Sequence, residues 1–67
     1  METLAEALPK EMARVRDKLL PVYDQIPAGK IAATMMRASL DSAARAMVEG
    51  DLVAMIQCYQ SLKDYSL

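Results

Sequence analysis

Residues 43–57, AARAMVEGDLVAMIQ, decide the fold because two helix-favouring stretches meet there at Gly50 and Asp51. A glycine just past the last turn of a helix takes the left-handed conformation that ends it, and an aspartate is a favoured N-cap for the next helix. Only these two residues separate the stretches, so the two helices must lie side by side and antiparallel. The sequence therefore predicts a tight C-terminal hairpin of two helices, residues 30–49 and 52–65.

Apolar residues before the hairpin also recur at a helical spacing. They follow one another in steps of four, three, four, three and four: Leu8, Met12, Val15, Leu19, Val22 and Ile26. A stripe of this period faces a partner element. Thr3 to Glu6 matches a capping box, but proline beyond the first turn disrupts a helix, so we expect an opening turn and then the main helix from Pro9. Because the stripe continues past Pro21, we predict one first helix that is kinked at Pro21 and ends at Pro27.

Each helix of the predicted hairpin has an apolar face. The expected row on the first is Ala32, Met36, Leu40, Ala43 and Met47, and on the second it is Leu52, Met55, Ile56, Tyr59 and Leu62. Asp41 lies four residues from both Arg37 and Arg45, a spacing that allows it to pair with both arginines. The sequence thus predicts an all-α fold, with three helices in a single small domain that spans residues 1–67.

The chain is short, with 67 residues, of which 54% are apolar and 25% charged, and a net charge of -1. A single domain of this length has a small core and little net stability. One cysteine and no histidine exclude an intramolecular disulfide and most zinc sites. The sequence shows neither a secretion signal nor a membrane span, and a lone cysteine suits a reducing compartment. We expect a cytoplasmic protein with no cofactor, no metal and no membrane partner.

The sequence also disfavours catalysis. Without histidine there is no Ser–His or Cys–His pair, and the commonest general base is missing. Cys58 lies in mid-helix with no cation nearby in sequence, which is typical of a half-buried structural cysteine. A raised carboxyl pKa requires burial. Four aspartates are expected at solvent-facing positions and lack that burial: Asp17, Asp24, Asp41 and Asp64. We therefore expect no enzymatic activity and no small-molecule substrate.

Apolar side chains beyond the main stripes are the candidate contacts with another protein. Leu20 and Tyr23 form a second apolar edge on the first helix. Met35 and Met36 are adjacent and point about 100° apart, so both are buried only if their helix is covered on two sides. Methionines that merely fill the core are the alternative. We expect a non-enzymatic protein-interaction module, and a homodimer whose first helices pair across a two-fold axis and bury Leu20 and Tyr23.

A second hypothesis is a small nucleic-acid-associated regulator. Four basic residues of the first helix would make its contact surface, namely Lys10, Arg14, Arg16 and Lys18. Residues 1–30 nevertheless contain five basic and five acidic side chains. A helix that binds DNA or RNA usually belongs to a markedly basic domain. An ordinary solvated helix face is therefore the better interpretation of these residues, and nucleic acid is not the expected partner.

Two resemblances concern the fold and the source of the chain. Residues 50–62, with Gly50, Asp51 and Tyr59 at the expected spacing, resemble the turn and second helix of a tetratricopeptide repeat. The repeat has alanine where this chain has Met55, and no second copy follows, so the resemblance implies the hairpin geometry and no repeat function.

The whole chain is similar to short uncharacterised helical proteins encoded by proteobacterial phages and prophages. The stretches that suggest it are ALPKEMAR (residues 7–14), MMRASL (residues 35–40) and EGDLVAM (residues 49–55). This resemblance implies a phage accessory or host-interaction protein, and it assigns no activity, cofactor or site residue.

Overall fold

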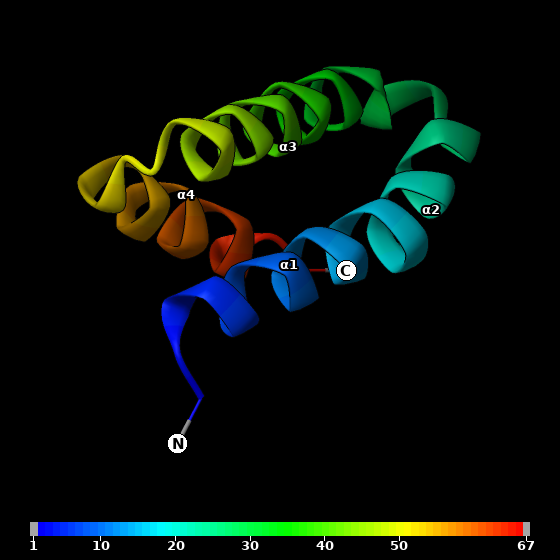
Figure 1. Cartoon of the computed structure of the whole chain (residues 1–67). Coiled ribbons are helices and arrows are strands. Elements are labelled where there is room, and N and C mark those ends of the chain that lie inside the picture. Colours follow the sequence, from blue (N-terminus) through cyan, green and yellow to red (C-terminus); the bar gives the residue numbers. More distant parts are fainter. Residues whose placement is uncertain (1, 67) are drawn as a thin grey trace.

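The computed structural model describes residues 2–66. Within that range the regular structure is helical and contains no strand. The elements in chain order are α1 (Leu4–Arg14), a π-helical turn (Val15–Leu19), α2 (Leu20–Gln25), a 3-10 turn (Pro27–Gly29), α3 (Lys30–Glu49) and α4 (Leu52–Asp64). The predicted all-α class is confirmed, and Figure 1 shows the hairpin of α3 and α4.

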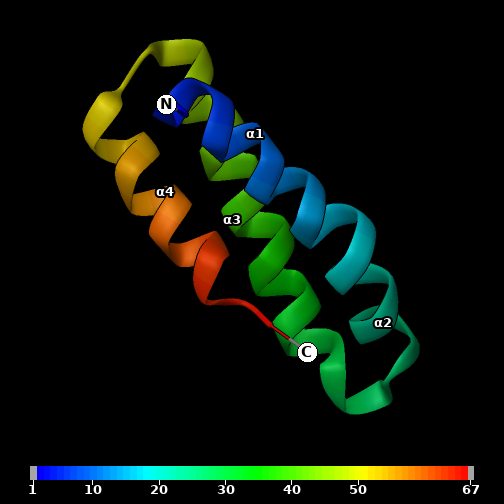
Figure 2. The ribbon, with the colours of Figure 1, turned by 90° about the horizontal axis from the view of Figure 1, so that it is seen from below.

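Three helical segments pack against one another along the length of the molecule. We call α1, the π turn and α2 together the first arm, because they follow each other as one helical path (Figure 1). α4 packs against both α1 and α3, and α2 packs against α3. The molecule measures 36 × 22 × 15 Å. Figure 2 shows the α3–α4 turn at one end of it and the α2–α3 connection at the other.

The α3–α4 turn has the geometry that the sequence predicts. Gly50 is left-handed at φ 66°, ψ 27°. Its amide bonds the Met47 carbonyl at 3.2 Å, and the amide of Asp51 bonds the Ala46 carbonyl at 3.0 Å, which together make a Schellman motif. The Asp51 side chain then caps α4 by accepting a hydrogen bond from the Ala54 amide at 3.2 Å. Local capping chemistry therefore fixes both the end of α3 and the start of α4.

Replacing Gly50 by valine should lower the melting temperature of the domain. A left-handed residue with a Cβ costs roughly 1–2 kcal/mol, and a β-branched one costs more. No heavy atom lies within 4 Å of a Cβ built at this position, so the cost comes from the backbone alone. Thermal unfolding followed by circular dichroism measures it, with Gly50→Asn as the control because asparagine tolerates this conformation. Equal melting temperatures for wild type and valine variant would contradict the turn geometry.

The start of the first arm differs from the prediction, because α1 begins at Leu4 and continues through Pro9. The expected break at Pro9 is therefore wrong. Proline removes the hydrogen bond to the carbonyl of Ala5, but Ala5 is exposed, so water can satisfy that oxygen. The Thr3 side chain makes no capping hydrogen bond, so the predicted capping box is not formed either.

A π turn takes the place of the simple kink predicted at Pro21. The Leu20 amide bonds the carbonyl of Val15, five residues back, where an α-helix would use the carbonyl four residues back. Proline has no amide hydrogen, and its ring collides with the carbonyl four residues before it, which here belongs to Asp17. A wider turn immediately before Pro21 relieves that collision, so the first arm continues into α2 without ending.

The π turn changes which residues of α2 face the core. A π turn holds one extra residue, and one residue corresponds to about 100° of rotation around the helix. Leu20 is consequently only 8% exposed and Tyr23 is half-buried, whereas Val22 and Ile26 are 38% and 45% exposed. The predicted stripe is correct as far as Leu19 and wrong after it.

The core lies where the first arm, α3 and α4 meet. Its buried members among the described residues are Leu8, Val15, Leu19, Leu20, Ala33, Met36, Ala43, Ala46, Met55 and Leu62. The three alanines belong to α3, and their small side chains let neighbouring helices approach closely. On α4 the predicted face is right for Met55 and Leu62 but wrong for Leu52 and Ile56, which are 61% and 44% exposed.

Candidate functional site

Large apolar side chains remain exposed at the two ends of the molecule. At one end they lie on α2 and the start of α3, and at the other they lie around the α3–α4 turn. We call the first group the corner patch, made of Val22, Ile26, Ile31 and Met35. We call the second group the hairpin patch, made of Val48, Leu52, Val53 and Ile56. These two patches are the most prominent candidates for contact with another molecule.

The hairpin patch is formed by the last turn of α3 and the outer side of α4. Val48 is 88% exposed, and Leu52 and Val53 are 61% and 66% exposed. Ile56 lies four residues after Leu52 and three after Val53, so these three side chains are neighbours on one helix surface. α4 therefore presents two apolar sides: Met55 and Leu62 face the core, and this group faces solvent.

The corner patch surrounds the connection between α2 and α3. Ile31 and Met35 are 76% and 56% exposed and lie four residues apart on α3. Together with Lys30 and Thr34 they line a shallow apolar hollow of about 260 Å³. Sequence reasoning anticipated only Met35 of the whole patch. Ile31, like Val48 and Val53 in the hairpin patch, is a large apolar residue outside the main predicted stripes. That position was the signal in the sequence that could have indicated its exposure.

Charged residues differ between the two ends. Glu49 and Asp51 flank the α3–α4 turn, and neither forms an ion pair with another described residue. Lys30 lies in the hollow of the corner patch and is likewise unpaired among residues 2–66. The hairpin patch therefore has an acidic border, and the corner patch has a basic one.

The nearby charges cancel in pairs. Arg45 binds Asp41 at 2.7 Å, as predicted, but Arg37 reaches across to Asp24 of α2 at 2.5 Å instead of pairing with Asp41. Both pairs are well exposed and contribute little to stability. Because these four side chains neutralise one another, the charges of Lys30 and of the α3–α4 turn stay uncompensated.

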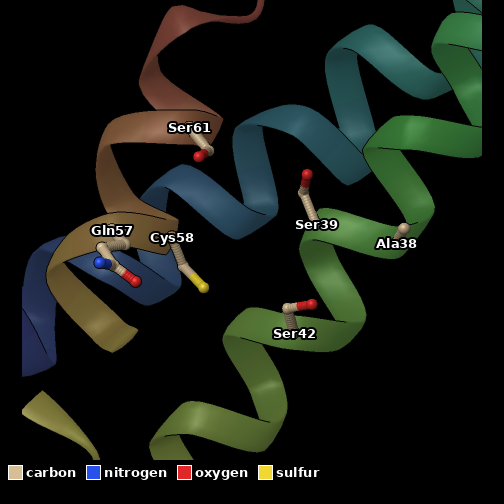
Figure 3. A pocket seen from close by; sticks show the side chains of 6 residues that line it. All are labelled: Ala38, Ser39, Ser42, Gln57, Cys58 and Ser61. Atoms are coloured by element: carbon tan, nitrogen blue, oxygen red, sulfur yellow. The ribbon is translucent and has the colours of Figure 1, made fainter. Parts of the chain in front are cut away.

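A shallow groove of about 270 Å³ separates α3 from α4 (Figure 3). Ala38, Ser39 and Ser42 line it from α3, and Gln57, Cys58 and Ser61 line it from α4. Figure 3 shows the Cys58 sulfur pointing into this groove. No basic side chain lines the groove, so nothing there stabilises a thiolate. The groove contains hydroxyl groups and a thiol, but no basic side chain that would activate one of them as a nucleophile.

The predicted protein-contact residues fall into two classes. Met35 is exposed and belongs to the corner patch. Leu20 and Met36 are 8% and 1% exposed, so they form part of the core of the single chain. Tyr23 is half-buried, and its hydroxyl donates a hydrogen bond to the Ser66 carbonyl. The expectation that a second copy is needed to bury Leu20 is therefore wrong, because the π turn already places it inside.

The predicted nucleic-acid residues form no continuous basic surface. Lys10 pairs with Glu2, and Arg16 pairs with Asp17 at 2.9 Å. The hydrogen bond from Arg16 lowers the pKa of Asp17, and the same contact raises the pKa of Arg16. Lys18 is exposed on the π turn. With two of these basic side chains paired to carboxylates, little net positive charge remains on this side of the first arm.

Arg14, the fourth of them, holds the C-terminal part of the chain. Its guanidinium pairs with Glu11 at 3.0 Å and donates hydrogen bonds to the carbonyls of Leu62 and Tyr65, at 2.9 and 3.0 Å. These oxygens belong to the last turn of α4 and its C-cap, where carbonyls lack the usual bond from an amide four residues later. The Leu62 carbonyl also accepts a hydrogen bond from the Tyr65 amide at 3.2 Å. The Tyr65 hydroxyl in turn lies 3.1 Å from that of Ser39 on α3. Arg14 therefore acts as a C-cap supplied by another helix.

Replacing Arg14 by methionine should destabilise the domain by about 1.5–3 kcal/mol, the scale of hydrogen bonds to a charged group. The methionine keeps much of the apolar stem and removes the donors, so the loss reports the two carbonyl contacts together with the ion pair to Glu11. Arg16→Met is the matched control, since Arg16 is exposed and bonds only its neighbour Asp17 among the described residues. Urea unfolding measures both variants. Equal losses for the two would show that the capping contacts contribute nothing.

Other kinds of site find no support in residues 2–66. No group of three potential metal-ligating side chains occurs within that range. None of the helices described there is long and apolar enough to cross a membrane. Comparisons of the chain with protein-family models, with curated proteins and with solved structures find no match in any of the three.

Proposed function

We propose that this chain is a non-enzymatic protein-interaction module that docks through its two apolar ends. The observation behind the proposal is that eight large apolar side chains of residues 2–66 stay 38% to 88% exposed although the chain has closed a core of its own. No buried side-chain polar atom of the described residues lacks a hydrogen-bond partner. Exposed apolar side chains that gather at particular places on a folded domain mark interaction surfaces.

The chemistry of the patches supports contact with a protein. Burial of apolar surface contributes about 25 cal/mol per Å², so covering either end favours association. Branched aliphatic side chains provide most of both patches, and Met35 adds a flexible one that adapts to the shape of a partner. The absence of histidine and the uncharged surroundings of Cys58 give no support to a catalytic role.

The proposed setting is the cytoplasm of a bacterial cell, and the proposed class is a phage or prophage accessory protein that contacts host or phage proteins. The setting rests on the single cysteine, which suits a reducing compartment. The class rests on the resemblance of the sequence to short phage-encoded helical proteins.

Site-specific photo-crosslinking in living cells tests the proposed function. A photoreactive amino acid is placed at Val53 in the hairpin patch or at Ile31 in the corner patch. Matched controls carry it at Gln60 on α4 and at Ala44 on α3, which are exposed but belong to neither patch. We expect protein adducts from the patch positions only, with the crosslinked peptide identified by mass spectrometry. Adducts that form equally at the control positions, or at no position, would overturn the proposal.

A further inference from the structure

The two apolar patches complement each other in charge. The hairpin patch is bordered by Glu49 and Asp51, and the corner patch by Lys30. Glu6, in the first turn of α1, adds to the acidic end, since α1 begins beside the α3–α4 turn (Figures 1 and 2). Among residues 2–66, each end thus combines aliphatic side chains with charges of one sign that form no ion pair, and the opposite sign is found at the other end.

Complementary ends favour one arrangement of two copies over the others. If two hairpin patches met across a two-fold axis, each copy would face its own acidic residues, Glu49 and Asp51, and like charges disfavour such a contact. Two corner patches would bring Lys30 against Lys30. A hairpin patch placed on a corner patch instead joins apolar to apolar surface and sets acidic residues opposite a lysine.

We infer that the partner of the hairpin patch is the corner patch of a second copy of this chain. The inference rests on the proposed interaction function and names its partner. The contact is head to tail, so an open assembly keeps one free hairpin patch at one end and one free corner patch at the other. Such contacts close into a ring or continue as a filament, according to the rotation between successive copies. This arrangement replaces the two-fold pairing of first helices, which loses its basis once Leu20 is buried within one chain.

The size of the ends sets the strength of the contact. Each patch has four large apolar side chains, far fewer than the roughly 20–30 residues a side of a standard stable interface. A single head-to-tail contact is therefore weak, with a dissociation constant of roughly 10 μM to 1 mM, as for small transient interfaces. Ring closure would strengthen the assembly because the last contact forms within one complex.

Two one-sided variants test the inference directly. Val53→Asp places a carboxylate in the hairpin patch, and Ile31→Asp places one in the corner patch. Both positions are exposed, at 66% and 76%, so both variants should fold, as circular dichroism and melting temperature will verify. We expect wild-type protein to self-associate with rising concentration in sedimentation velocity and NMR diffusion. Each variant alone should remain monomeric, because every head-to-tail contact needs both patches.

An equal mixture of the two variants should form a one-to-one heterodimer. The Ile31→Asp variant keeps its hairpin patch, and the Val53→Asp variant keeps its corner patch, so exactly one contact is possible between them. In a sample with isotope label only in Ile31→Asp, the shifts should concentrate on Leu52 and Ile56. Exchanging charges adds a second test: Lys30→Glu should weaken association by up to about fivefold, and Glu49→Lys in the same chain should restore it.

Three results would overturn the inference. If Ile31→Asp still dimerises alone, two hairpin patches pair with each other. If Val53→Asp dimerises alone, two corner patches do so. If wild-type protein stays monomeric up to about 1 mM, the upper end of the expected range, no such contact exists. In that last case the proposed interaction function still stands if photo-crosslinks at the patches alone join the chain to a different protein. It fails if they join the chain to none or form equally at the control positions.

Discussion

Leu20→Asp should unfold the domain, whereas Val22→Asp should leave it folded with nearly unchanged stability. Leu20 is 8% exposed and packs in the core, so the substitution removes about 2–3 kcal/mol of apolar burial and leaves a carboxylate without a partner there. A domain of 67 residues has a total unfolding free energy of roughly 3–10 kcal/mol, at about 0.05–0.15 kcal/mol per residue. The cost of burying the unpaired carboxylate, added to the lost apolar burial, is therefore comparable to the whole unfolding free energy of the domain.

Val22 provides the matched control for this substitution. It lies two residues away on the same helix, has a similar aliphatic side chain and is 38% exposed, so its carboxylate can reach water. Changes at such surface positions usually stay within about 0.5 kcal/mol. Circular dichroism and urea unfolding measure both variants. The unbroken heptad stripe predicts the reverse order, with Val22 in the core, so a folded Leu20→Asp and an unfolded Val22→Asp would show that the π turn is absent.

The sequence was sufficient for the parts of the fold that local chemistry determines. The bounds of α3, Lys30–Glu49, agree with the prediction, and α4 ends at Asp64, one residue before its predicted end. Gly50 and Asp51 take the predicted roles because left-handed glycine and an N-capping carboxylate act within a few residues of themselves. The same local character explains why the all-α class could be predicted from spacing alone.

The features that could not be predicted depend on contacts between distant residues or on small changes of helical register. The stripe from Leu8 to Ile26 has no irregular step, so periodicity alone gives no indication of an extra residue in the helix. Arg14 looked like part of a solvated basic row, yet it binds carbonyls 48 and 51 residues later in the chain. Nothing near Arg14 in sequence specifies those carbonyls, because they come from another helix.

The candidate site follows the same division. The adjacency of Met35 and Met36 indicated that one of them is exposed unless their helix is covered on two sides, but it did not decide which one. Val22 could not be predicted as exposed, because its exposure follows from the rotation introduced by the π turn. Ile26 could not either, because it lies just past the end of α2 in extended backbone. The opposite charges of the two ends also needed the structure. Glu49 and Lys30 are 19 positions apart in α3. The structure shows that nearby charges are neutralised in ion pairs, which leaves an unpaired acidic residue at one end of the helix and an unpaired lysine at the other.

Gly29→Ala should destabilise the domain by about 1–3 kcal/mol, the usual cost of forcing extra atoms into a packed site. Gly29 is buried, and a Cβ built on it lies 2.6 Å from the backbone oxygen of Tyr23. The opposing atom belongs to the main chain, so no side-chain rotation can remove the clash. The α2–α3 connection itself would have to move, and it positions both Tyr23 and the corner patch. A loss of this size lowers the melting temperature by roughly 4–8 °C per kcal/mol in a domain this small.

The sign of the effect makes this substitution informative. Gly29 has φ -89° and ψ 0°, a conformation that residues with a Cβ take in type I turns. In open space the change would therefore stabilise the protein by about 0.4–1 kcal/mol, because alanine restricts the unfolded chain. Gly50→Ala is the converse control, with no atom within 4 Å of the new Cβ but a φ of +66°. A Gly29→Ala variant that melts higher than wild type would show that α2 and α3 do not approach each other as closely as this connection requires.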